Sequence, residues 1–179
     1  MKEKFAPTIV LGCICLIASL LLAAVYQITA PQIEAITIAN ANASRQEVMP
    51  EATSFSEVDC ELVDGVQEVY VSDNGTGYVI TAGAKGFGGT VVVMTAIDQT
   101  GTIEKVKVTD VSTETAGLGS KTADASYTDQ YTGGQVITND AEGEGQYIKP
   151  ISGATYSSKA VFAAVSAALE QYAQIGGTK

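Results

Sequence analysis

An uncharged apolar run near the N-terminus constrains this chain more than any other feature. Residues 8–28 read TIVLGCICLIASLLLAAVYQI and contain no Asp, Glu, Lys or Arg. At a rise of about 1.5 Å per residue, a helix of this length crosses the roughly 30 Å hydrocarbon core of a bilayer. The sequence therefore predicts a transmembrane helix at 8–28, preceded by a short tail at 1–7.

The charges on either side of the run predict its orientation. Lys2 and Lys4 precede it, whereas residues 29–44 contain Glu34 and no basic residue. Basic residues collect on the cytoplasmic side of a membrane helix. We therefore expect a single-pass protein of the cell membrane, with its tail in the cytoplasm and its C-terminal domain outside.

A cleaved signal peptide is the alternative to an anchor. Residues 10–13 (VLGC) resemble a lipobox, but few apolar residues precede Cys13 and the apolar run continues well past it, which favours an uncleaved anchor. Cys13 and Cys15 then count as small hydrophobic residues of the span. Cys60 is the one cysteine beyond it, so the outer domain has no internal disulfide.

Composition excludes several classes of function. The 179 residues include 20 acidic and 10 basic side chains, for a formal charge of −10, and no His. Without His, the chain cannot form a Ser-His-Asp triad or a His-ligated zinc or haem site. The negative charge argues against nucleic acid as a partner. The acidic loop at 140–145 resembles a calcium loop but lacks the closing Glu of an EF-hand, so we expect a solvated loop and no metal site.

Beyond the span, the patterns predict a helical stalk and then an α+β domain. The stalk covers 29–50, with a helix at 32–48 that Pro50 ends. The outer domain covers 51–179. Its strands are expected at 58–63, 66–71, 77–81, 90–97, 103–111 and 135–138. The first two would form a hairpin around Asp64-Gly65, and the whole set reads as an antiparallel meander.

The C-terminal part of the domain reads as helix. A polar helix or turn is expected near 124–131 and a longer helix at 156–174, closed by Gly176-Gly177. Six apolar residues of the longer helix recur at spacings of three and four, from Ala160 to Leu169, which predicts one buried stripe.

Three glycine-containing loops are the candidates for function: 84–89 (AKGFGG), 114–121 (ETAGLGSK) and 152–155 (SGAT). Glycine clusters often mark only turns, and the second loop lacks the spacing of a Walker P-loop. The third loop places Thr155 in the first turn of the final helix, where unpaired N–H groups and the helix dipole favour a phosphate. The alternative is that Thr155 only caps that helix.

The chain resembles the FMN-binding domain family in the order of five features. These are the span, the Ala-rich stalk, the Gly-aromatic-Gly-Gly turn, the Glu-Thr-x-Gly-Leu-Gly loop and the Ser-Gly-Ala-Thr loop. The chain is similar in particular to the G subunit of Rnf-type electron transport complexes. The related C subunit of the sodium-pumping NADH:quinone reductase shares the loops. The resemblance covers nearly the whole chain, and its specificity lies in the ordered set.

The resemblance implies a covalent flavin. The last residue of Ser152-Gly153-Ala154-Thr155 would be joined to the phosphate of FMN by a phosphodiester, which a separate flavin transferase installs using FAD. Lys149 stands where the family usually has Asp, six residues before this Thr.

The resemblance also implies the contacts of the flavin ring. Leu118 would pack on the isoalloxazine, while Glu114, Thr115 and backbone N–H groups of the same loop, with Gly117 and Gly119, would contact its polar edge. The turn at 86–89 would line the same cleft.

The implied function is that of a membrane-anchored flavoprotein subunit. It would carry electrons, without being catalytic alone, among the other membrane subunits of an ion-translocating ferredoxin:NAD oxidoreductase. The alternatives are a free-standing extracytoplasmic FMN carrier, or an anchored binding or structural domain without a cofactor.

Overall fold

The computed structural model describes residues 2–176, with the side chains of 10–33 and 36–176. It divides into two compact units, Met1–Ala41 and Asn42–Lys179. The predicted tail at 1–7 is helical from Lys2 onward, and Met1 lies outside the described residues, as do Gly177 and the two residues after it.

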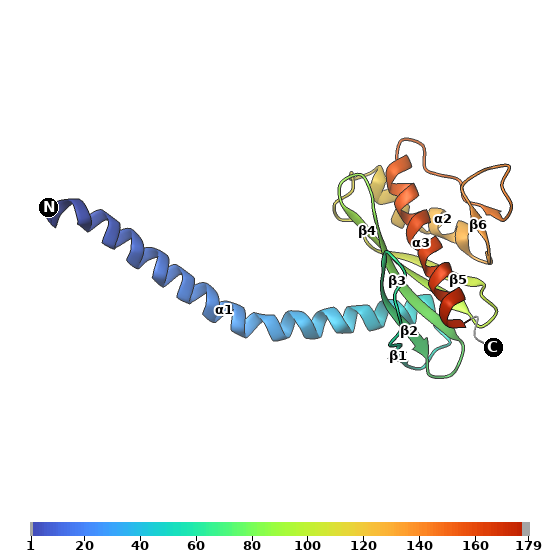
Figure 1. The fold of residues 1–179 in the computed structure, drawn as a ribbon, viewed down its shortest axis with the longest axis horizontal. Helices are drawn as coiled ribbons and strands as arrows, with labels where there is room; N and C mark the ends of the chain where they lie inside the picture. Colours follow the sequence, from blue (N-terminus) through green and yellow to red (C-terminus); the bar gives the residue numbers. More distant parts are fainter. Residues whose placement is uncertain (1, 177–179) are drawn as a thin grey trace. The chain divides into compact units, whose positions relative to one another are not determined.

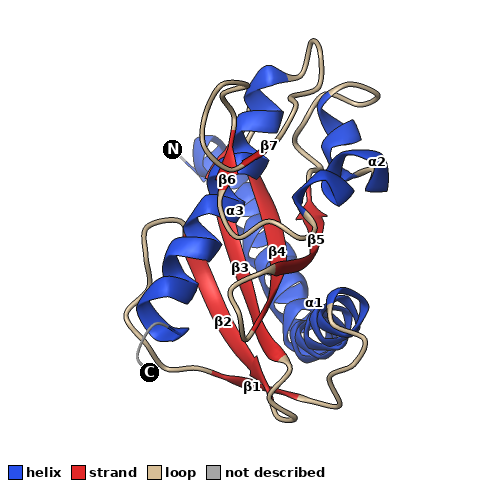
Figure 2. Ribbon diagram, turned by 90° about the vertical axis from the view of Figure 1, so that its right-hand side faces the viewer, coloured by secondary structure: helices blue, strands red, loops and turns tan. Residues whose placement is uncertain are grey.

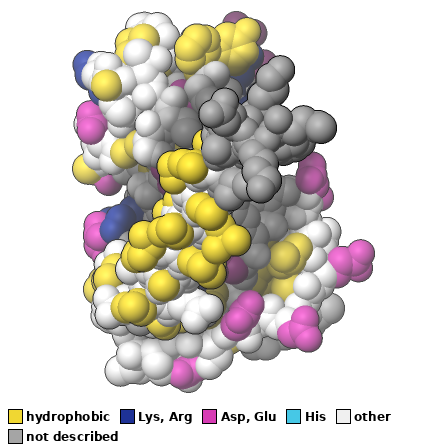
Figure 3. Space-filling view, turned by 90° about the vertical axis from the view of Figure 1, so that its left-hand side faces the viewer, with side chains coloured by type: hydrophobic (Ala, Val, Ile, Leu, Met, Phe, Trp, Pro, Cys, Tyr) yellow, Lys and Arg dark blue, Asp and Glu magenta, His cyan; other side chains and the backbone are white. Residues whose placement is uncertain are grey.

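The first unit is helical throughout its described length. Helix α1 (Lys2–Val48) contains the predicted span and is long and apolar enough to cross a membrane. Its large side chains from Val10 to Ile28 are exposed. Figure 3 shows hydrophobic side chains in more than one group on the face it draws, with acidic side chains scattered among the other residues.

Within the described residues, the second unit is built on a sheet of five antiparallel strands in sequence order (Figures 1 and 2). The strands are β1 (Phe55–Glu57), β2 (Val66–Ser72), β3 (Gly77–Lys85), β4 (Thr90–Asp98) and β5 (Ile103–Asp110). The antiparallel meander predicted from the sequence is confirmed for β2 to β5.

The strand predicted at 58–63 is wrong. These residues form a loop, and the strand that pairs with β2 is the shorter β1 just before them. Val58 at the start of the loop donates its N–H to the carbonyl of Val69 on β2 at 2.9 Å, but the end of the loop is held by helix α3. The N–H of Val63 donates to Oε1 of Gln171 at 2.7 Å, and Nε2 of Gln171 donates to the carbonyl of Glu61 at 3.1 Å. Asp64-Gly65 therefore does not close the predicted hairpin.

Short elements follow the sheet, and then the long helix. The predicted helical region is present as η1 (Gly119–Ala123), α2 (Ala125–Thr128) and η2 (Asp129–Tyr131). The strand predicted at 135–138 is β6 (Ile137–Thr138), which pairs in parallel with β7 (Gln146–Tyr147), a strand that the sequence did not predict. Helix α3 (Thr155–Gly176) begins one residue earlier than expected.

Helix α3 lies across one face of the sheet (Figure 2). The predicted stripe is its buried side, with Val161, Val165 and Ala168 fully buried, and it packs on side chains such as Ile80 and Val93. Because side chains alternate along a strand, Val79 points to the opposite face. There it belongs to a second core cluster with the end of α1.

The last turns of α1 pack on this opposite face of the sheet. Val48 and Met49 are buried there against Met94. Arg45 is 3% exposed and lies over the ring of Tyr70, at 3.5 Å from its centroid. Residues 42–50, which the sequence assigned to the stalk, are therefore packed into the domain.

Candidate functional site

The three glycine-containing loops meet at the N-terminal end of α3. The turn between β3 and β4, the loop after β5 and the loop before α3 line an open pocket of about 120 Å³. The turn supplies Phe87, and the loop before α3 supplies Gly153 and Ala154. The loop after β5 supplies Thr115 and Leu118, together with Gly119 at its end. Segments far apart in the sequence thus form one site.

The walls of this pocket are rich in exposed apolar surface. Phe87 is 70% exposed and Tyr156, from the first turn of α3, is 69% exposed. Their ring centroids are 6.4 Å apart and their planes are tilted by 50°. Leu118 is also exposed. Large exposed apolar side chains grouped around a pocket are typical of a binding site.

Glu114 lies behind the pocket rather than on its wall. Its side chain is buried: Oε1 accepts a hydrogen bond from the N–H of Gly88 at 2.9 Å, and Oε2 accepts one from the hydroxyl of Ser157. Burial by itself raises the pKa of Glu114, but the hydrogen bonds from Ser157 and from the backbone of 87–89 outweigh it and hold the pKa below its ordinary value. The carboxylate is therefore ionised, and its hydrogen bonds go to groups of the protein itself.

Two glycines are required by this close packing. A Cβ at Gly88 would overlap the carbonyl oxygen of Thr113, and a Cβ at Gly119 would lie 2.6 Å from Oγ of Ser157 and 2.9 Å from Oε2 of Glu114. Only a residue without a side chain allows the loops to approach this closely.

Thr155 is the first residue of α3 and is exposed. The carbonyl of Ala154 accepts the N–H of Ser158 at 2.9 Å, so Ala154 and not Thr155 occupies the capping position. Within residues 2–176, the hydroxyl of Thr155 makes no hydrogen bond, and no acceptor meets the N–H of Thr155, Tyr156 or Ser157. The alternative that Thr155 serves as a helix cap is therefore wrong.

Thr155 does not line the pocket formed by the three loops, although Ala154 and Tyr156 on either side of it do; it lines a second hollow of about 60 Å³. Ile148 and Phe162 line it, and so does Lys159, one helical turn after Thr155. Lys149 is exposed, and its backbone N–H donates to Oε1 of Gln130 at 3.0 Å. The surroundings of Thr155 are therefore partly basic although the chain is acidic.

The remaining predicted site residues take different places. Gly117 has φ +74°, and its N–H donates to Oγ of Ser120 at 2.9 Å, so it shapes the loop and does not line the pocket. Ser152 is exposed beside Gly153, whose φ of +84° forms the turn into the helix.

The sequence did not single out Tyr156 or Ser157. Tyr156 lies four residues before Ala160 on the apolar stripe, and that spacing predicts burial rather than exposure. Phe87 belongs to the turn at 86–89, which was expected to line the same cleft as Leu118, and it does line the pocket with Leu118.

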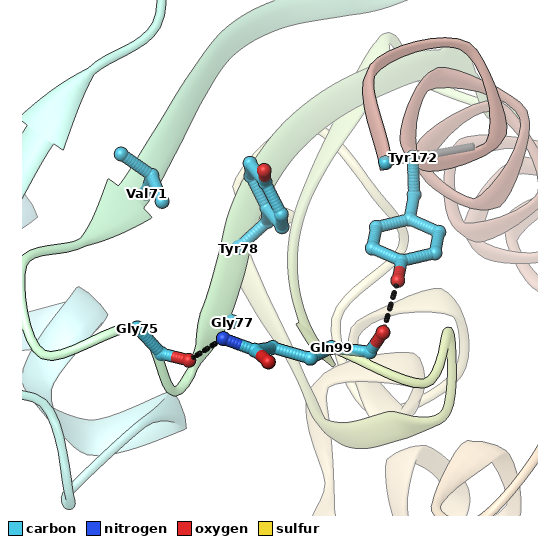
Figure 4. Close-up of a pocket in the computed structure, with 7 residues that line it drawn as sticks. Val71, Gly75, Gly77, Tyr78, Gln99 and Tyr172 are labelled. Carbon is cyan, nitrogen blue, oxygen red and sulfur yellow. Dashed lines mark hydrogen bonds between the residues drawn. The ribbon is translucent and has the colours of Figure 1, made fainter. Parts of the chain in front are cut away.

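Another pocket lies at the far end of α3, about 25 Å along the helix from Thr155 (Figure 4). There the hydroxyl of Tyr172 donates to the carbonyl of Gln99 at 2.8 Å, and its ring meets that of Tyr78 edge-on. These contacts fasten the end of α3 to the turn between β4 and β5. The described side chains contain no group of three or more Cys, Asp or Glu placed to hold a metal ion.

Comparison with known proteins agrees with the loop arrangement. Residues 86–170 match the family model described as FMN-binding domain. The chain is 32% identical to the G subunit of the Na⁺-translocating ferredoxin:NAD⁺ oxidoreductase complex of Acetobacterium woodii, over 96% of this chain and 92% of that protein. It is 28% identical to the G subunit of the proton-translocating ferredoxin:NAD⁺ oxidoreductase complex of Clostridium ljungdahlii, over 98% and 95%.

Solved structures share the fold. The C subunit of the Na⁺-translocating NADH-quinone reductase from Parabacteroides distasonis superposes with a TM-score of 0.53 at 20% identity, over 64% of this chain and 63% of that one. NqrC of Shewanella oneidensis gives 0.51 at 19% identity, over 73% and 72%. The resemblance expected from the ordered loops is confirmed: this chain belongs to the FMN-binding domain family, with the G subunits of ferredoxin:NAD⁺ oxidoreductase complexes among its relatives.

Proposed function

We propose that this chain is a membrane-anchored flavoprotein subunit that carries electrons through FMN in an ion-translocating ferredoxin:NAD⁺ oxidoreductase complex. Two relatives matched over nearly their whole length are named as the G subunits of such complexes. The FMN-binding domain model covers residues 86–89 of the first loop and the whole of the other two. The flavin supplies the electron-transfer chemistry when it is bound, and the protein holds and orients it. This division of labour suits a chain without His.

The side chains around the pocket suit a flavin ring. Phe87, Leu118 and Tyr156 offer exposed apolar surface, on which a flat aromatic system can pack. Thr115 and the backbone of 118–119 line the same pocket and supply polar groups for the ring edge.

The observation that carries the proposal is the state of Thr155. Its hydroxyl is exposed and unbonded among the described residues, directly beside the pocket and next to three N–H groups that also lack an acceptor there. These N–H groups and the positive end of the α3 dipole stabilise a phosphate. Lys159 adds a positive charge one turn further on. We therefore assign Thr155 as the covalent attachment site, with a flavin transferase that uses FAD as the partner in maturation.

We further propose that α1 spans the membrane with Lys2 and Lys4 in the cytoplasm and the flavin domain outside. The other membrane subunits of the complex are then its partners. Purification of the detergent-solubilised chain from its own cells distinguishes this from a free-standing carrier, because a member of the complex co-purifies with multi-spanning proteins and a free-standing carrier does not.

Expression of the full chain with a flavin transferase tests the attachment site. The wild-type chain should give a fluorescent band after denaturing electrophoresis and an intact mass increased by one FMN group. Thr155→Val should lack both, whereas Thr109→Val, which changes an exposed threonine on β5, should keep both. A colourless wild-type chain, or a fluorescent band that persists in Thr155→Val, would overturn the assignment.

A further inference from the structure

Glu114 is a buried charge without a cationic partner. Within the described residues, the ion pairs are Arg45–Glu68 and Lys107–Glu47, and neither involves Glu114. Glu114 is 6% exposed, and its carboxylate is met by dipoles, namely backbone N–H groups of 87–89 and the hydroxyl of Ser157. The positive end of α3, which contains Ser157, adds to them.

Each partner of Glu114 adjoins a wall of the pocket. Gly88 follows Phe87, and Ser157 follows Tyr156. A Cβ at Gly86 would lie 2.5 Å from Oε1 of Glu114, so the turn is folded tightly around this carboxylate. The single side chain of Glu114 therefore fixes the distance between the two aromatic walls.

We propose that Glu114 is a positioning residue that joins the three loops and, as an ionised carboxylate behind the pocket, lowers the reduction potential of the flavin held there. The proposal rests on the proposed function, because it requires FMN in this pocket. Reduction adds negative charge to the flavin, and a fixed negative charge nearby in a poorly solvated site opposes it. Hydrogen bonds that hold the pKa of Glu114 below its ordinary value keep the carboxylate charged at neutral pH.

The test compares flavin reduction potentials of the full flavinylated chain by spectroelectrochemical titration. Glu114→Gln removes the charge while its amide can still accept from Gly88 and donate to Ser157. It should shift the potential in the positive direction by about 30 mV or more, the equivalent of roughly tenfold in a two-electron equilibrium. Glu114→Asp, which keeps the charge, should stay closer to wild type. Glu144→Gln, at an exposed acidic residue, is the matched control and should not shift it.

A second variant separates the charge from general loosening of the loops. Ser157→Ala removes a donor from the carboxylate and leaves its charge less compensated, so the potential should shift in the negative direction. Loosened loops would move both variants the same way. An unchanged potential in Glu114→Gln, or shifts of the same sign in both variants, would overturn the proposal.

Two other results, a variant that does not fold and a wild-type chain without flavin, can be told apart from a failure of the proposal. If Glu114→Gln fails to fold, as judged by its thermal unfolding, Ser157→Ala decides alone: a negative shift supports the proposal and any other result overturns it. Absence of covalent flavin from the wild-type chain would instead count against the proposed function, because it is seen before any potential is measured.

Discussion

A single buried side chain, Gln171, determines the path of a whole segment. It is fully buried on α3, and its amide satisfies the backbone of Glu61 and Val63. The segment 58–63 has the alternating apolar residues of a strand, and the N–H of Val58 at its start donates to the carbonyl of Val69 on β2. Further along, the carbonyl of Glu61 and the N–H of Val63 bond to a side chain more than a hundred residues away. No local pattern contains that partner, which is why the sequence predicted a strand there.

We expect Gln171→Leu to lower the free energy of unfolding by about 1–3 kcal/mol, because it removes two part-buried hydrogen bonds and leaves the N–H of Val63 and the carbonyl of Glu61 without the amide. Thermal unfolding of the detergent-solubilised chain, followed by circular dichroism, measures the loss. Gln174→Leu, at an exposed position of the same helix, should change stability by less than about 0.5 kcal/mol. Equal losses in the two variants would contradict the role of the Gln171 amide.

Some residues of the site could be predicted from the sequence, whereas the place of others could not. Short motifs contain Thr155, Leu118 and Gly119. Such motifs can be recognised in the sequence because their residues are adjacent. The structure places all three at or beside the pocket. The place of Glu114 behind the pocket was not predictable, because it depends on Gly88 and Ser157, which reach it only through the fold.

At the scale of elements, the end of α1 was the least predictable part. Residues 39–44 are small and polar, which indicates a solvated stalk, and Arg is rarely buried. Arg45 is nevertheless buried, since its guanidinium lies over Tyr70 and its Nη2 lies 3.0 Å from Oε1 of Glu68. By contrast, helical spacing alone predicted five of the buried residues of α3, Ala160, Val161, Ala164, Val165 and Ala168, whereas Leu169 is only partly buried. The buried polar residues Ser157, Ser158 and Gln171 were not predicted, because apolar periodicity does not reveal them.

Arg45→Met should therefore destabilise the domain by about 1–3 kcal/mol, through loss of the contact with Tyr70 and of the ion pair. The lower part of this range reflects the partial exposure of Glu68, which weakens the pair. Chemical unfolding monitored by circular dichroism measures the change. Lys85→Met, at the exposed end of β3, serves as the control and should be nearly neutral. A neutral Arg45→Met would mean that apolar packing alone holds the end of α1.

At the scale of the whole molecule, the acidic composition determines how stability responds to pH. The chain has no His, so few groups titrate between about pH 6 and 8. Hydrogen bonds from Ser157 and from the backbone outweigh burial and lower the pKa of Glu114. Hydrogen bonds from Ser112 lower the pKa of Asp110. Burial raises the pKa of Glu104, which acts in the opposite direction.

A carboxylate whose pKa is lower in the folded state stabilises the fold above its unfolded pKa, and this stabilisation is lost as the pH falls through the folded pKa. We expect the melting temperature to be nearly constant from about pH 6 to 8 and to fall below about pH 4.5. Glu114→Gln should fall less steeply than wild type, while Glu144→Gln should follow the wild-type curve. A steep change near neutral pH would contradict this account.

The contacts of Glu114 also bear on the order in which the domain folds. Gly88 precedes it by 26 residues and Ser157 follows it by 43. Contacts of such separation form only after the intervening chain has been brought together, which costs loop-closure entropy. The pocket is therefore complete only when the β3–β4 turn and α3 have both been brought to Glu114. A chain in which either of them is still undocked would display Thr155 without a complete ring site beside it.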